Sequence, residues 1–208
     1  MTLAVPREPV VLTGSRVVLS VPVASDLDRV TELCQGKAVA AWTTVPSPYT
    51  RTDAETFVLG LVVEGWANAT SCTWGLRLSP DGELNGMVGL DGIRDGEAEL
   101  GYWLAPELRG TGLMSEAVAA VLEYAFAPTG QDGLGLERVV WHAFTGNAAS
   151  AAVARRAGFR FEGLRRRGGT QRGRRLDDWQ AGLLRDDQRV PAAGWPDETF
   201  VQRDPELR

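Results

Sequence analysis

Apolar and polar residues alternate in several short segments of the chain, and this period of two predicts β-strands. Residues 16–21 are the first example, with Val17, Leu19 and Val21 on one face. The turn sequence Ser-Pro-Asp-Gly at 79–82 predicts a hairpin between its two flanking strands. The further predicted strands are 71–78, 84–90, 98–104, 138–143, 159–162 and 176–184.

Apolar residues at helical spacing predict helices between these strands. The segment 113–126 shows this spacing most clearly, and Pro128 stops it. Residues 40–50 are predicted as a loop, and the remaining predicted helices are 26–35, 53–66 and 148–157. Asn147 is the predicted cap of the last of these helices. The order of elements predicts a mixed α/β chain with an antiparallel front and helical crossovers behind.

The chain of 208 residues is long enough for one large domain with its own core. We predict a single domain over residues 1–186 and an extended tail over 187–208, which is rich in Pro, Asp and Arg. No apolar run approaches the roughly 18 residues that span a bilayer, and the first residues do not resemble a signal peptide. We therefore expect a cytoplasmic protein without a membrane partner.

Cysteine and histidine are scarce. The two cysteines, Cys34 and Cys72, cannot form a disulfide framework, which suits a reducing compartment. The single histidine, His142, argues against a histidine-rich metal site, and we predict no metal. Its position between Trp141 and Ala143 in a predicted strand favours a structural role for it.

Charge is unevenly distributed along a chain whose net charge is −5. A nucleic-acid surface, a solvated face and local attraction for a phosphorylated cofactor are three interpretations of one basic stretch. The acidic total and the absence of interleaved aromatic residues argue against nucleic acid. Nine arginines lie in this stretch, at positions 155, 156, 160, 165, 166, 167, 172, 174 and 175.

A glycine loop joins the strand at 98–104 to the helix at 113–126. Gly110 and Gly112 allow the backbone to turn, and the first N–H groups of the helix have no partner within it. Together with the helix dipole and the charge of Arg109, these groups predict a pocket for a pyrophosphate. A Rossmann loop needs a third glycine where Ser115 stands and an acid in the strand at 138–143, and both are missing.

This loop resembles a known signature. The run Arg109-Gly110-Thr111-Gly112-Leu113-Met114 is similar to the Arg/Gln-x-x-Gly-x-Gly/Ala motif of GNAT-superfamily N-acetyltransferases. Its surroundings resemble the RimJ/RimL-like branch, which contains the ribosomal-protein N-terminal acetyltransferases. The motifs that carry this resemblance are Glu99-Leu-Gly-Tyr-Trp-Leu, Asn147-Ala-Ala-Ser150, Ala157-Gly158-Phe159, Glu162-Gly163 and Leu176-Asp177.

The resemblance covers about residues 10–186. It implies a GNAT fold of the α/β (α+β) class, with a mixed, mostly antiparallel sheet of six to seven strands and about four helices. It also implies acetyl-CoA as the cofactor, held by the residues from Arg109 to Ser115. Met114 departs from the signature, and Gly169 stands about where ribosomal-protein enzymes of this kind can carry a carboxylate.

Acetyl transfer to an amine needs a proton acceptor, donors for the thioester oxygen and a donor for the departing sulfur. By resemblance, Glu99 is the candidate base and Ser150 the donor on the sulfur side. The backbone N–H groups of Trp103 and Leu104 are candidate oxyanion donors. Asn147 and Arg156 are further cofactor contacts, and Trp42, Tyr49 and Asp177 are candidate acceptor contacts, with Asp177 also an alternative base.

The predicted function is therefore N-acetylation of a primary amine, either the N-terminus of a protein or a small molecule. A non-catalytic or regulatory acyl-CoA-binding module of the same fold is the first alternative. A nicotinamide-dependent oxidoreductase is a second, and the missing acid at 139–143 argues against it. The sequence leaves the identity of the acceptor open, and it does not decide between a monomer and a homodimer.

Overall fold

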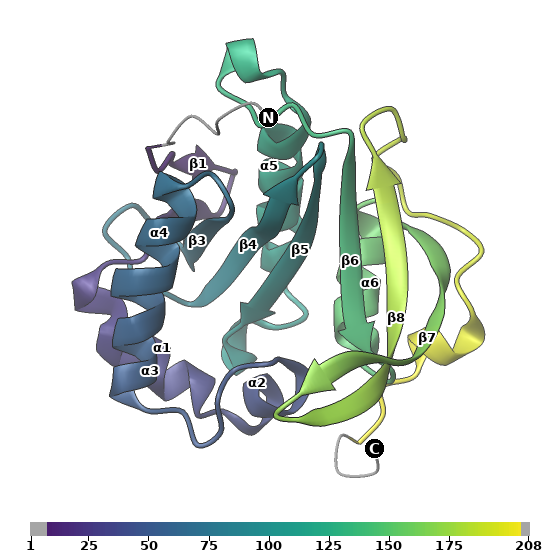
Figure 1. The fold of residues 1–208 in the computed structure, drawn as a ribbon, viewed down its shortest axis with the longest axis horizontal. Coiled ribbons are helices and arrows are strands. Elements are labelled where there is room, and N and C mark those ends of the chain that lie inside the picture. Colours follow the sequence, from purple (N-terminus) through teal and green to yellow (C-terminus); the bar gives the residue numbers. More distant parts are fainter. Residues whose placement is uncertain (1–7, 205–208) are drawn as a thin grey trace.

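One mixed sheet organises the molecule (Figure 1). The computed structural model describes residues 8–204, and within them eight strands form a sheet in the order β1-β2-β3-β4-β5-β6-β8-β7. Neighbouring strands are antiparallel except β5 and β6, which are parallel. The strands are Leu12–Thr13, Val18–Ser20, Cys72–Arg77, Gly86–Arg94, Glu97–Leu104, Arg138–Phe144, Arg160–Gln171 and Arg174–Leu184, for β1 to β8 in chain order.

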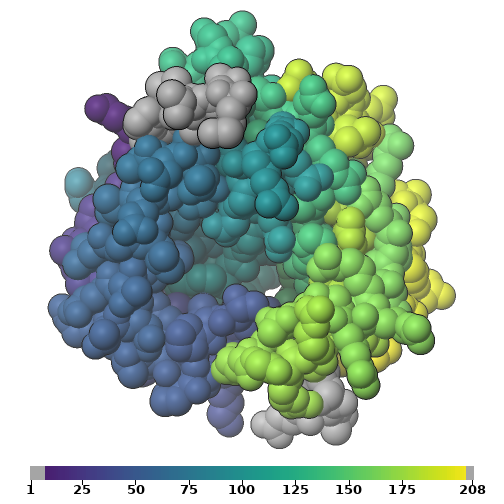
Figure 2. Space-filling model, in the orientation of Figure 1, coloured from purple at the N-terminus to yellow at the C-terminus, as the bar shows by residue number. Residues whose placement is uncertain are grey.

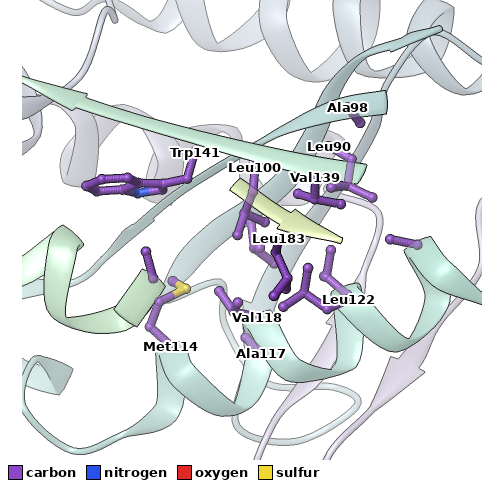
Figure 3. Close-up of a cluster of buried hydrophobic side chains, with 14 of the residues drawn as sticks. Leu90, Ala98, Leu100, Met114, Ala117, Val118, Leu122, Val139, Trp141 and Leu183 are labelled. Atoms are coloured by element: carbon purple, nitrogen blue, oxygen red, sulfur yellow. The ribbon is translucent and has the colours of Figure 1, made fainter. Parts of the chain in front are cut away.

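Helices cover both faces of this sheet. Helices α5 (Leu113–Phe126) and α6 (Ala148–Arg156) lie behind it in Figure 1 and bury the larger hydrophobic cluster. Figure 3 shows the part of this cluster that lies between α5 and the strands, with Trp141 and Met114 at the same end. On the other face a smaller cluster packs under α1 (Leu27–Cys34), α2 (Lys37–Trp42), α3 (Arg51–Glu55) and the π-helical turn Thr56–Leu61. Helix α4 (Val62–Ala67) follows this turn and buries Val62 and Trp66 in the larger cluster.

The parallel strands β5 and β6 separate soon after they meet. They pair only from Glu97 to Glu99 with Arg138 to Val140, and then diverge as Figure 1 shows. We call this divergence the fork. Beyond it, one backbone edge of β5 lacks a strand partner, so polar main-chain groups there are available to a ligand.

The structure confirms the fold class and corrects several elements. The sheet has one or two strands more than predicted, because β1 has only two residues and lacks a readable alternation. Residues 37–42, partly assigned to a loop, form α2. Strand β7 continues to Gln171 instead of stopping at 162, since its arginines occupy an edge strand whose side chains are mostly exposed. The helix Leu113–Phe126 has the predicted bounds.

The segment from residue 187 to 204 lies against the domain, whereas an extended tail was predicted. Trp195 is buried and donates from Nε1 to the carbonyl of Phe159 at 3.0 Å. Its ring contacts Trp141 and Phe161, with centroids 5.6 and 5.5 Å away. A short 3-10 helix, Asp197–Phe200, then packs against α6. Across residues 8–204, no helix has both the length and the hydropathy to cross a membrane.

Candidate functional site

The glycine loop presents a row of free backbone N–H groups. Gly110 and Gly112 have φ of 77° and 85°, a region that disfavours side chains, and Gly112 is the N-cap of α5. The first N–H of this segment with a helical acceptor is that of Glu116, which donates to Gly112 O at 3.1 Å. Within the described chain, the N–H groups from Gly110 to Ser115 have no protein acceptor. We call these N–H groups the cradle.

The cradle fits an anionic group. A Cβ built at Gly110 would have no heavy atom within 4 Å, so the space above its backbone is open. The side chains of Leu113 and Met114 are buried in the main core, which leaves their N–H groups as the part facing outward. Because Met114 packs inward, the bulk that departs from the resembled signature does not obstruct the cradle. A helix N-terminus of this kind favours a phosphate or diphosphate.

Two arginines support the loop. Arg109 donates from Nε to Leu104 O at 3.1 Å, which ties the loop to the end of β5. Arg16 donates to Thr111 O at 3.1 Å and forms an ion pair with Glu116 at 2.9 Å. This ion pair and its hydrogen bonds lower the pKa of Glu116 against the opposing effect of burial. No local pattern indicates a role for Arg16, because it lies about a hundred residues away from the loop in the chain.

The strand register distinguishes the two predicted oxyanion donors. Ala105 donates to Asn85 O at 2.7 Å, and hydrogen-bonded pairs alternate along an antiparallel ladder. The N–H of Trp103 therefore points toward β4, while that of Leu104 points to the edge opened by the fork. This geometry favours Leu104 as the donor.

A cluster of ionisable side chains lies on the sheet face that carries Glu99. Glu99 is the last residue of β5 paired with β6, and its Oε2 is 3.1 Å from Nδ1 of His142. Nε2 of His142 is buried and has no hydrogen-bond partner among the described residues. Asp91 stands directly opposite Glu99 on β4, and enclosure by protein, followed by the charge of Glu99, raises its pKa. Asp91 was not predicted as a site residue, and His142 was predicted to have only a structural role.

Ser150 lies on the opposite face of the sheet. Asn147 caps α6 by accepting the N–H of Ser150 at 3.2 Å, as the sequence predicted for a cap. The hydroxyl of Ser150 accepts from Trp141 Nε1 at 3.1 Å, and its carbonyl accepts from Tyr102 at 2.8 Å. Glu99 and Ser150 therefore flank the fork from its two sides. Burial raises the pKa of Tyr102, so this phenol stays protonated.

The other predicted contacts are dispersed. Tyr49 is buried in the smaller core, so its side chain supports the loop after α2. Trp42 ends α2 and is half-buried. Asp177 lies on the α6 side of the sheet, where it accepts the N–H of Arg167 at 2.7 Å, so it does not share a face with Glu99. Arg156 is exposed in the last turn of α6.

The tip of the β7–β8 hairpin closes one side of the Glu99 face. The Gln171 amide donates to Ala41 O at 2.9 Å and Thr43 O at 2.7 Å, and Arg172 donates to Ala40 O at 2.9 Å. Gln171 is buried, and Arg172 adopts a φ of 44° in the turn. Figure 2 shows the resulting hollow between the strands, the hairpin and α2. The rim of this hollow therefore joins segments that are about 130 residues apart in the chain.

Two cavities open on opposite faces of the sheet. One of about 310 Å³ lies beside α4 and is lined by Asp91, Glu64 and the apolar Phe57 and Leu61, among others. The other, of about 420 Å³, lies between β8 and the C-terminal segment, and Arg167, Arg175 and Asp177 line it. A Cβ at Gly169 would lie 2.7 Å from the ring of Phe144, so any side chain there, a carboxylate included, would force Phe144 to shift. Between residues 8 and 204, no three His, Cys, Asp or Glu side chains gather as a metal site requires.

Comparison with known proteins agrees with this geometry. Residues 16–160 match the acetyltransferase (GNAT) domain family, and the chain belongs to that family. Its sequence is 40% identical over 90 residues to YdaF of Bacillus subtilis (strain 168), which carries the name of a ribosomal N-acetyltransferase. That match covers 42% of this chain, and the chain spans about half the length of the curated relatives it matches.

Solved structures share the fold along nearly their whole length. A crystal structure named for an acetyltransferase has a TM-score of 0.75 and 27% identity, covering 86% of this chain and 99% of that one. RimL, a ribosomal L7/L12 α-N-protein acetyltransferase solved in complex with coenzyme A, has a TM-score of 0.73 and 22% identity. It covers 84% of this chain and 98% of its own. At that identity RimL establishes the fold alone.

Proposed function

We propose that this protein transfers an acetyl group from acetyl-CoA to a primary amine. The observation that carries the proposal is the cradle, a run of unpaired N–H groups beside the fork of β5 and β6. Glu99 and Ser150 flank that fork from opposite faces, as a reaction with an incoming amine and a leaving sulfur requires. Membership of the GNAT family supports the same reaction.

Coenzyme A fits the residues that are present. The cradle binds its diphosphate through backbone N–H groups, while Arg109 and Arg16 add positive charge beside it. Asn147 and Arg156 remain proposed contacts for the rest of the cofactor, and the Asn147 side chain already caps α6. When bound, the cofactor supplies a thioester whose carbonyl carbon accepts the amine nitrogen.

The protein's own groups would accept or donate the two protons that the amine loses, and would stabilise the negative charge that develops on the thioester oxygen. Glu99 accepts a proton from the acceptor ammonium, directly or through water, while His142 holds the carboxylate from its other side. The N–H of Leu104 stabilises the thioester oxygen as it gains negative charge. Ser150 is the hydroxyl on the other side of the fork, where it would hydrogen-bond the departing sulfur and deliver the second proton, which the nitrogen loses as the amide forms.

The acceptor is the N-terminus of a polypeptide or a small-molecule amine. Relatives named for ribosomal-protein acetylation support the first class. The hollow bounded by Gln171, Arg172 and the end of α2 favours an acceptor whose amine is at a narrow end of the molecule. Polypeptide N-termini and small-molecule amines both meet this condition. This site lacks the carboxylate that ribosomal-protein enzymes of this kind can carry near position 169, and a side chain at Gly169 would have to displace the ring of Phe144.

Calorimetric titration with coenzyme A, followed by thiol release from acetyl-CoA over a panel of amines, tests the proposal. The panel should contain peptides with free N-termini, the same peptides blocked at the N-terminus but carrying lysine, and small polyamines. We expect saturable binding and thiol release with at least one unblocked amine. Failure to bind coenzyme A would overturn the proposal, and binding without turnover over the panel would favour the non-catalytic module.

A further inference from the structure

Ser150 is held by both strands of the fork. Tyr102 from β5 donates to its carbonyl at 2.8 Å, and Trp141 from β6 donates to its hydroxyl at 3.1 Å. The side chains of Tyr102, Trp141 and Ser150 also interact as one polar cluster in a largely apolar core. A serine in a helix usually bonds a carbonyl of the preceding turn, so these two long-range donors are specific to this site.

The bond from Trp141 fixes the role of the hydroxyl. An indole N–H can donate and cannot accept, so Ser150 Oγ must be the acceptor in this bond. Its own proton is therefore directed away from Trp141. The carbonyl of Gly146, four residues earlier, instead accepts the N–H of Arg203 at 2.9 Å, and that of Asn147 accepts the N–H of Ala151.

The C-terminal segment supports both partners of this bond. Trp195 packs on the buried Trp141 with ring centroids 5.6 Å apart. Gln202 Oε1 accepts the N–H of Ala149 at 3.1 Å, in the first turn of the helix that carries Ser150. Segment 187–204 therefore braces the strand that donates and the helix that accepts.

We propose that Trp141 is a positioning residue, which holds the Ser150 hydroxyl as an acceptor on one side and so presents its proton to the departing sulfur. Trp195 and the C-terminal segment keep Trp141 in this position. The proposal rests on the transferase function above and goes beyond it, because it assigns roles to an indole in β6 and to the segment after the domain.

A double-mutant cycle between Trp141→Phe and Ser150→Ala tests the coupling through steady-state rates and coenzyme A affinity. Loss of one hydrogen bond predicts that Trp141→Phe lowers kcat about 3- to 10-fold with an unchanged dissociation constant for coenzyme A. In the Ser150→Ala background the same change should have no further effect on kcat. Multiplication of the two effects would show a merely structural role for Trp141 and overturn the proposal.

Trp179→Phe is the matched control. Trp179 is equally buried in the neighbouring strand β8, but its Nε1 has no hydrogen-bond partner among residues 8–204. This variant removes the same atoms from the same core and should leave kcat within about twofold. If Trp141→Phe does not fold, Trp195→Phe takes its place in the cycle, since Trp195 packs directly on Trp141.

The C-terminal segment has its own variant. Trp195→Phe keeps a ring against Trp141 and loses the bond to Phe159. It should reduce kcat less than Trp141→Phe and have no effect in the Ser150→Ala background. A wild-type protein that releases no thiol with any amine refutes the transferase itself, whereas an active enzyme indifferent to Ser150→Ala refutes this inference alone.

Discussion

The cradle and the Glu99 face are built in different ways. The cradle is a continuous stretch of backbone from Gly110 to Ser115, whose N–H groups are left unpaired by the geometry of a helix start. The Glu99 face is made of side chains from β4, β5 and β6, and its rim is closed by bonds between the hairpin tip and the residues after α2. The cradle presents backbone N–H groups, which almost every residue type has, whereas the Glu99 face presents particular side chains.

This difference separates cofactor from acceptor. A diphosphate recognised by N–H groups tolerates changes in the side chains around it, as the buried Met114 illustrates. In the proposed reaction the amine is recognised by Glu99, Asp91 and the hollow beside them, so its binding depends on each of those groups. Changes on the Glu99 face should therefore alter turnover and acceptor affinity with little effect on coenzyme A, and changes in the cradle should do the reverse.

Glu99→Gln should show the largest difference between the two regions, because it should change kcat and not coenzyme A affinity. The substitution keeps the size of the side chain and removes the proton acceptor, so kcat should fall about 10²- to 10⁴-fold. The dissociation constant for coenzyme A should stay within about twofold. Steady-state thiol release and calorimetry measure the two quantities.

Glu97→Gln provides the control on the same strand and the same face. Glu97 bonds Arg138 at 2.9 Å at the closed end of the fork, away from its divergence, and its replacement should leave kcat nearly unchanged. Normal turnover by Glu99→Gln would show that Glu99 is not the base. Another group of this face would then have that role, and Asp91 would be the first to test.

The next effect concerns the cradle. Gly110→Ala places a methyl group in the open space above the loop, and we expect coenzyme A to bind about tenfold more weakly, or about 1.4 kcal/mol. Saturating cofactor should restore kcat. Gly92→Ala is the control, because Gly92 also has a positive φ and open surroundings but lies in the β4 bulge between Asp91 and Arg94, outside the cradle. Equal loss of affinity in both variants would mean that backbone strain, rather than the methyl group, is responsible.

The same division explains how far the sequence could predict the molecule. The cradle and the helix behind it were predicted because a glycine loop, a helix start and an apolar repeat are local patterns, and the structure has the predicted helix bounds. The cap at Asn147 was predicted for the same reason.

Long-range contacts set the limit of that prediction. Asp91 faces Glu99 only because of the β4–β5 register, and Trp195 is buried only because strands β6 and β7 give it a surface. The face on which Asp177 lies follows from its pairing with β6, and spacing along the chain does not reveal it. Helix α2 was missed because its six residues are too few for a clear repeat.

A smaller effect is expected at the rim of the Glu99 face. Gln171→Leu removes the amide that donates to the carbonyls of Ala41 and Thr43 and should cost about 1–3 kcal/mol of unfolding free energy. In a chain of this size that lowers the Tm by several degrees, about 2–4 °C for each kcal/mol. The KM for the acceptor should change while coenzyme A affinity does not.

Gln131→Leu is the control for this variant, since Gln131 is exposed in a short 3-10 helix after α5, far from the hairpin along the sheet. A change in coenzyme A affinity in Gln171→Leu would show that the hairpin contact also shapes the cofactor side. The separation of the two regions would then be incomplete.

The smallest effect is a pH-dependent gain in stability from Asp91→Asn. Enclosure by protein and the charge of Glu99 raise the pKa of Asp91 above its unfolded value, so its charged form destabilises the folded state. That cost is fully present above the folded pKa and disappears as the pH falls below the unfolded value near 3.9. Asp91→Asn should therefore raise the Tm at pH 7.5 by about 1–2 °C, a modest shift because water still reaches this side chain, and by nothing near pH 3.5.

Repeating the measurement in the Glu99→Gln background identifies the cause. Enclosure by protein raises the pKa of Asp91 more than the charge of Glu99 does. Most of the gain in Tm should therefore survive the loss of that charge. A gain that vanishes would instead mean that the two carboxylates repel each other strongly across the β4–β5 pair. The Glu99 face would then hold its base beside a like charge, which favours a proton on one of the two and makes an arriving ammonium the natural counter-ion of the pair.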